Sequence, residues 1–72
     1  MSHASHAAHV ATLIDDLSDV SLAQLADLRE YAQALQLEEG TVHLERSIRD
    51  REARRVELFS LLQQAAFGPP LE

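Results

Sequence analysis

The chain has 72 residues, of which 46% are hydrophobic and 25% charged, and it contains no cysteine. This size allows one small domain, and the lack of cysteine excludes disulfides, thiolate metal sites and thiol catalysis. Twelve acidic and six basic residues give a net charge of −6, which argues against nucleic acid as a partner. No apolar run approaches the ~20 residues that span a bilayer, and the first residues do not resemble a signal peptide, so we expect a cytoplasmic protein with no membrane partner.

The first predicted element is a short helix over residues 5–17. Its apolar residues recur with the 3.6-residue period of an amphipathic helix: Ala7, Val10, Leu13, Ile14 and Leu17. Asp15 and Asp16 lie near its C-terminus, where carboxylates oppose the helix dipole. We therefore expect this helix to end early, with a turn over residues 18–21. Residues 1–20 then form an N-terminal helix and turn.

A second helix is predicted to begin at Leu22. Ser21 and Gln24 have the spacing of a capping box, and Val20 and Leu25 that of a hydrophobic staple around it. From there the apolar residues follow the 3-4-3 spacing of a coiled-coil seam: Leu25, Leu28, Ala32 and Leu35.

A turn near residues 39–41 is predicted to separate the second helix from a third. Gly40 suits the left-handed position that follows a helix, and Thr41 can cap the next one. The third helix is expected over residues 42–66, because Gly68 and two prolines follow it. Residues 21–67 then form a helical hairpin and 68–72 a C-terminal tail. The alternative is one helix of some 45 residues that tolerates Gly40 at a cost of about 1 kcal/mol.

The hairpin is expected to form a homodimer. Its third helix has an apolar stripe of its own, and a fold of this size without disulfides or metal has little interior. Two hairpins packed face to face would bury both stripes in a four-helix bundle. The predicted dimer core contains Leu25, Leu28, Ala32, Leu35, Leu44, Ile48, Leu58, Phe59 and Leu62.

Arg51 and Arg55 interrupt the apolar stripe of the third helix. A buried guanidinium group needs a carboxylate, a phosphate or several carbonyl groups, and in a hairpin Asp27 and Glu30 are the nearest acids. Three interpretations stay open: a polar layer that fixes the register of the helices, a contact for an acidic partner or an anionic ligand, and a catalytic site.

No convergent catalytic set and no phosphate-binding loop occurs in the sequence. His3 and His6 share a helix face, but we expect only adventitious metal binding from a helix terminus, and no cofactor. The sequence thus predicts an all-α, non-enzymatic interaction module, a regulator or adaptor that binds another protein. The alternatives are an anion-binding or catalytic helical dimer and a structural coiled-coil segment of a larger assembly.

Overall fold

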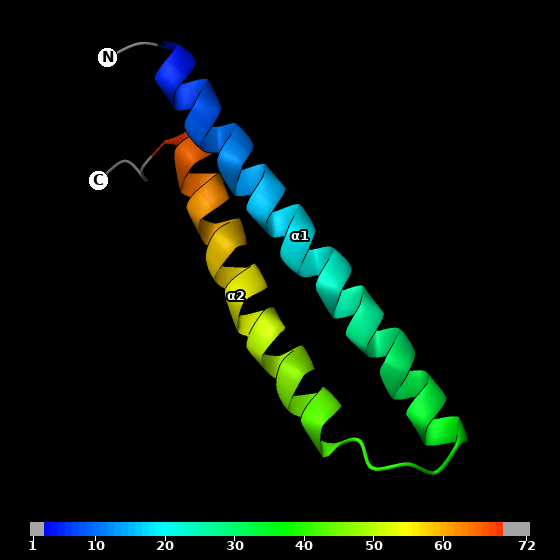
Figure 1. The fold of residues 1–72 in the computed structure, drawn as a ribbon. Coiled ribbons are helices and arrows are strands. Elements are labelled where there is room, and N and C mark those ends of the chain that lie inside the picture. Colours follow the sequence, from blue (N-terminus) through cyan, green and yellow to red (C-terminus); the bar gives the residue numbers. More distant parts are fainter. Residues whose placement is uncertain (1–2, 69–72) are drawn as a thin grey trace.

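The computed structural model describes residues 3–68, which form two long helices packed side by side (Figure 1). Helix α1 spans His3–Gln36 and helix α2 spans Val42–Phe67, and residues 37–41 connect them. The N-terminal end of α1 and the C-terminal end of α2 lie at the same end of the molecule, so the helices run antiparallel (Figure 1). The all-α class and the helical hairpin are confirmed.

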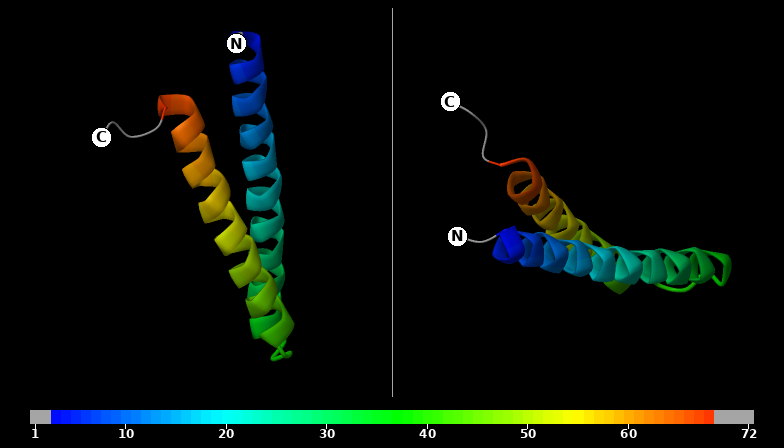
Figure 2. Two further views of the ribbon diagram at one scale, coloured as in Figure 1. Left: turned by 90° about the vertical axis from the view of Figure 1, so that its left-hand side faces the viewer. Right: turned by 90° about the horizontal axis from the view of Figure 1, so that it is seen from above.

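The hairpin is thin and extended. Its extents are 54 × 26 × 13 Å and its radius of gyration is 16.4 Å, whereas a compact chain of this length has a radius of gyration of about 11 Å. The helices converge near the chain ends in Figure 1 and near the loop in the left view of Figure 2, so they cross at an angle. Because the described chain has two helices, each contacts the other along a single line.

That line of contact follows a heptad pattern in both helices. The residues of α1 that face α2 are Val10, Leu13, Leu17, Val20, Gln24, Asp27, Tyr31 and Ala34, all of them buried or half-buried. Those of α2 are Leu44, Ile48, Arg51, Arg55, Leu58, Leu62 and Ala65. Both series alternate steps of three and four residues, which keeps one stripe of each helix against its neighbour. Polar residues occupy the middle of each stripe and apolar residues its two ends.

The predicted break at residues 18–21 is wrong, because α1 is helical throughout. No glycine or proline lies in this segment, and Ser, Asp and Val cost only a few tenths of a kcal/mol each inside a helix. Val20 is half-buried between the helices, and Gln24 donates a hydrogen bond to Glu52 instead of closing a capping box with Ser21. Contacts with α2 therefore outweigh the local capping signals. In the described part of the predicted N-terminal segment, residues 3–20, the chain belongs to α1 and forms no separate helix.

The loop is built differently from the prediction. Glu38, not Gly40, has the left-handed conformation, with φ = 57°. The Glu39 N–H donates to the Ala34 carbonyl at 2.9 Å and the Glu38 N–H to the Leu35 carbonyl at 3.3 Å. These are the two hydrogen bonds of a Schellman motif, in which the residue after the helix C-cap adopts positive φ. The left-handed residue of the turn is thus two residues before Gly40, where the sequence predicts it.

Replacing Glu38 with glycine is expected to stabilise the hairpin by roughly 0.5–1 kcal/mol. Glycine adopts positive φ without the steric cost that a Cβ atom imposes there. The free energy of unfolding from urea denaturation measures the gain. Glu39→Gly is the matched control, because Glu39 has no positive φ; it should give no gain. An equal gain from both variants would contradict this description of the loop.

Helix α2 begins and ends close to the predicted bounds. Thr41 precedes it as N-cap, and its hydroxyl donates to the Glu45 carboxylate at 2.7 Å instead of accepting from a backbone N–H. Gly68 follows the helix with φ = 77°, a conformation that a side chain would strain. Residues 69–72 of the predicted tail lie outside the described residues.

Candidate interaction surfaces

Asp27 is the centre of a polar layer between the two helices. The Ser47 hydroxyl donates to its Oδ2 atom at 2.6 Å, and Nε of Arg51 donates to the same oxygen at 2.7 Å. Only 14% of the Asp27 side chain is exposed, against 39% of Arg51. The hydroxyl of Ser47 and the guanidinium of Arg51 hold the pKa of Asp27 below its usual value. The carboxylate is therefore ionised at neutral pH, and α2 provides the donors that it needs.

Glu52 forms the second half of the layer. Arg55 donates to it through two nitrogens, Nε to Oε1 at 2.9 Å and Nη2 to Oε2 at 2.7 Å. Gln24 of α1 donates to Oε1 at 2.9 Å, which ties the pair to the other helix. The Arg55 guanidinium, and then the Gln24 amide, lower the pKa of Glu52 to about 2. Glu52 in turn raises the pKa of Arg55.

Both arginines that the sequence singled out are thus paired with carboxylates of the same chain. Asp27 is one of the two acids expected near Arg51. The other, Glu30, lies beside the connecting loop, where it lines a groove with Gly40 and His43. Glu52 was not anticipated as the partner of Arg55, although its i, i+3 spacing is a sequence signal for such a pair.

Replacing Glu52 with glutamine is expected to lower stability at neutral pH and to flatten its dependence on acid. A carboxylate with a lowered pKa stabilises the fold above its ordinary pKa of about 4.5, and this contribution disappears as the pH falls toward 2. Thermal unfolding of both proteins between pH 7 and pH 2 should show the wild type more stable at pH 7 and the two converging below pH 4.5. A difference that stays constant over this range would contradict the pairing.

The four apolar residues predicted as the seam of the second helix do not face α2. Leu25, Leu28 and Leu35 are 48%, 42% and 54% exposed, and Ala32 is also exposed. They lie one position after the residues that contact α2, so they form a neighbouring stripe on α1. Their role in a dimer core stays a prediction.

The five α2 residues predicted for the same core divide between the two surfaces. Leu44 and Leu58 are buried against α1, and Ile48 and Leu62 are half-buried there. Phe59, 46% exposed, faces outward. Sequence reasoning missed Ala34, which is buried near the loop. Its heptad spacing from Leu13 through Leu17 and Val20 was the available signal.

One side of the hairpin combines exposed apolar groups from both helices. Ile14 and Val10 of α1 line a groove with Phe59, Leu62 and Ala66 of α2. Nearer the loop, a second groove on this side is lined by Gln24, Leu28, Tyr31, Glu45, Ile48, Arg49 and Glu52. We call this side the apolar face. It extends along α1 from the chain ends to the loop.

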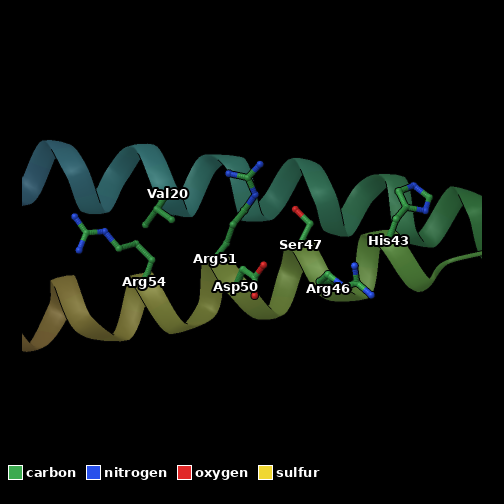
Figure 3. Close-up of a pocket in the computed structure, with 7 residues that line it drawn as sticks. All are labelled: Val20, His43, Arg46, Ser47, Asp50, Arg51 and Arg54. Atoms are coloured by element: carbon green, nitrogen blue, oxygen red, sulfur yellow. The ribbon is translucent and has the colours of Figure 1, made fainter.

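The opposite side is polar. A groove there is lined by Val20 of α1 and by His43, Arg46, Ser47, Asp50, Arg51 and Arg54 of α2 (Figure 3). Arg51 and Ser47 point toward α1 in this view (Figure 3). Arg54 forms an ion pair with Glu57, one turn further along its own helix. The groove is lined by three arginines and one acid, Asp50, and the adjoining groove adds Asp16 and Asp19 of α1 beside Arg51 and Arg54. The polar face therefore carries charges of both signs.

No group of three or more His, Cys, Asp or Glu side chains in the described part of the chain could hold a metal ion. The side chain of His3 lies outside the described residues, so the predicted His3–His6 pair is not placed. Within residues 3–68, neither helix contains a stretch long and apolar enough to cross a membrane.

Comparison with protein-family models, with curated proteins and with solved structures finds no match to this chain.

Proposed function

We propose that the chain is a non-enzymatic helical interaction module, a small cytoplasmic regulator or adaptor that acts as a homodimer and binds another protein. The observation that carries this proposal is the apolar face. Leu25, Leu28 and Leu35 on α1 are 48%, 42% and 54% exposed, and they recur along one face of this helix. Monomeric proteins rarely leave a long continuous apolar stripe in water, because its burial against another surface is favourable.

The thinness of the hairpin supports the same proposal. With a smallest extent of 13 Å, the hairpin is one helix layer thick. Each helix can therefore bury only the stripe that faces its neighbour, and the remaining apolar groups need a surface from elsewhere. Helix-on-helix packing is the common way in which such an amphipathic surface binds a partner. The net charge of −6 favours a protein partner over nucleic acid.

The pairing of the arginines argues against the anion-binding and catalytic alternatives. Arg51 is occupied by Asp27, and Arg55 by Glu52. An anion that entered here would have to displace a carboxylate already within hydrogen-bond distance. The layer fits the first of the three interpretations, in which it fixes the register of the two helices.

Native mass spectrometry on the chain purified gently from its own host tests the proposal. We expect masses of the dimer and of a dimer with a second polypeptide bound. Leu25→Glu should reduce these complexes, while Arg54→Glu on the polar face should keep the dimer. A monomer with no polypeptide bound would overturn the proposal. A dimer that retains a small anion, and loses it in the double variant Arg51→Leu/Arg55→Leu, would support the ligand-binding alternative instead. Large regular oligomers would support the structural coiled-coil alternative.

A further inference from the structure

The outward stripe of α1 is complementary to itself in reverse order, because small side chains in one half correspond to large ones in the other. Its eight residues follow steps of three and four: Ala11, Ile14, Ser18, Ser21, Leu25, Leu28, Ala32 and Leu35. Seven of them are exposed, and Ser21 is half-buried. Three residues in the N-terminal half are small and one is large, whereas three in the C-terminal half are large and one is small. We call these eight residues the self-matching stripe.

We propose that the occupant of the self-matching stripe is the same stripe of a second copy of this chain, with the two α1 helices antiparallel. The two-fold axis passes beside Ala23. A residue of one copy therefore lies level with the residue of the other copy for which the two residue numbers add up to 46. This inference rests on the proposed function, because it specifies how the interaction module pairs with itself.

Every layer of this arrangement combines one small and one large side chain. The four layers, each present twice by symmetry, are Ala11 with Leu35, Ile14 with Ala32, Ser18 with Leu28, and Ser21 with Leu25. Helix interfaces pack at the density of protein interiors, which requires nearly constant volume from layer to layer. Small residues opposite large ones satisfy this requirement and let the two helices approach closely.

Other arrangements of the same stripe pack less evenly. A parallel pair in register places leucine on leucine and serine on serine, which gives overfilled layers beside empty ones. An antiparallel pair shifted by one heptad places Ser18 on Ser21 and Ile14 on Leu25. The register centred beside Ala23 is thus the one in which all four layers have similar volume.

The charges beside the stripe fit the same register. Asp15 and Arg29 flank it on its solvent side, and neither forms an ion pair within residues 3–68. In the antiparallel pair Asp15 of each copy lies two residues from the level of Arg29 of the other, so both ends gain an opposite-charge contact. Leu22, 65% exposed, lies between them and meets its own copy at the axis.

The area of contact is sufficient for a specific dimer. The stripe is about 36 Å long at 1.5 Å per residue, and a helix is about 10 Å wide. The outward part of α2 adjoins it on the apolar face, where Phe59 and Ile14 line one groove. Two helices on each side then cover roughly 700 Å² per copy, close to the ~800 Å² of a standard interface.

Disulfide cross-linking tests the orientation directly, because the natural chain has no cysteine. Ile14→Cys and Ala32→Cys are made as separate variants. Under mild oxidation a mixture of the two should give a cross-linked dimer, and each variant alone should not. In the antiparallel pair, the equivalent positions of two copies lie roughly 27 Å apart, beyond the ~7 Å limit for Cα atoms joined by a disulfide. Cross-linking of each variant alone, without the mixed product, would overturn the proposal.

A matched pair of charge substitutions tests which face of the hairpin forms the dimer. Leu28 and Leu61 are both 42% exposed, but Leu61 lies two turns after Arg54 on the polar side of α2. By sedimentation equilibrium, Leu28→Glu should raise the dimer dissociation constant at least tenfold and Leu61→Glu less than threefold. Circular dichroism at high concentration verifies that both variants fold. Equal effects of the two substitutions would overturn the proposal.

A charge swap tests the register. Arg29→Asp should weaken the dimer several-fold, because each acid then faces Asp15 of the other copy, and Asp15→Arg/Arg29→Asp should restore it. If the double variant did not restore the dimer, the proposed register would be wrong.

Failure of this inference remains distinguishable from failure of the proposed function. A monomer that binds a different polypeptide through Leu25 would overturn the self-pairing and the homodimer, but not the binding of another protein. A chain that forms neither a homodimer nor a complex with another polypeptide would overturn both the self-pairing and the proposed function.

Discussion

Replacing Leu58 with alanine is expected to lower the free energy of unfolding by about 2–4 kcal/mol. Leu58 is 2% exposed, the lowest value among the buried residues of the described chain, and it lies where α2 contacts the N-terminal half of α1. Removal of a buried leucine loses its transfer free energy and leaves a cavity that long, straight helices cannot close. Since small domains have only a few kcal/mol of stability, urea denaturation should show the midpoint shifted to a much lower concentration.

Leu61→Ala is the matched control for this prediction. Leu61 lies on the same helix, three residues later, and is 42% exposed. Its truncation should change the free energy of unfolding by less than about 0.5 kcal/mol, as surface substitutions generally do. If both alanine variants lost the same stability, α2 would not face α1 through Leu58.

Replacing Asp19 with proline is expected to cost about 3 kcal/mol or more. In the continuous α1, Asp19 lies in the middle of the helix, where proline removes the hydrogen bond to the carbonyl of Asp15 and its ring clashes with that group. In a chain with a turn at residues 18–21, proline would be tolerated at this position. The two descriptions of α1 therefore predict opposite results for one variant.

Asp19→Ala separates the backbone effect from the loss of the carboxylate. Asp19 is exposed, and alanine favours the helix, so this variant should be as stable as the wild type or slightly more so. Helix content from circular dichroism and the thermal unfolding midpoint provide the comparison. A proline variant as stable as the alanine variant would show that α1 is broken near residue 19.

The hairpin was predictable because two signals favour it over a single helix through Gly40. Residues 38–41 interrupt the apolar period, and Gly68 with two prolines ends it, so the existence and bounds of α2 followed directly. The continuity of α1 was not predictable from local signals. Ser21 and Gln24 have the spacing of a cap, and only contacts with α2 show that Gln24 is used for Glu52 instead.

The orientation of α1 was the harder part of the site. Two stripes of α1, one position apart, both follow heptad spacing, and the sequence predicts the more apolar of them as the seam. The structure places the mixed stripe inward, because Asp27 and Gln24 find partners in Ser47, Arg51 and Glu52. The pairing of Arg51 with Asp27 followed from the sequence once the turn was located, since antiparallel helices bring those positions level.

Both described chain ends lie at one end of the hairpin, and the loop lies at the other (Figure 1). Anything attached to the N-terminal or the C-terminal side therefore emerges from the same tip. In the antiparallel pair proposed above, the two such tips point away from each other, and each loop lies beside the open end of the other copy. Two bodies attached at these tips would then be held apart by about the 54 Å length of one hairpin. Energy transfer between fluorophores placed on the two N-termini would report that separation.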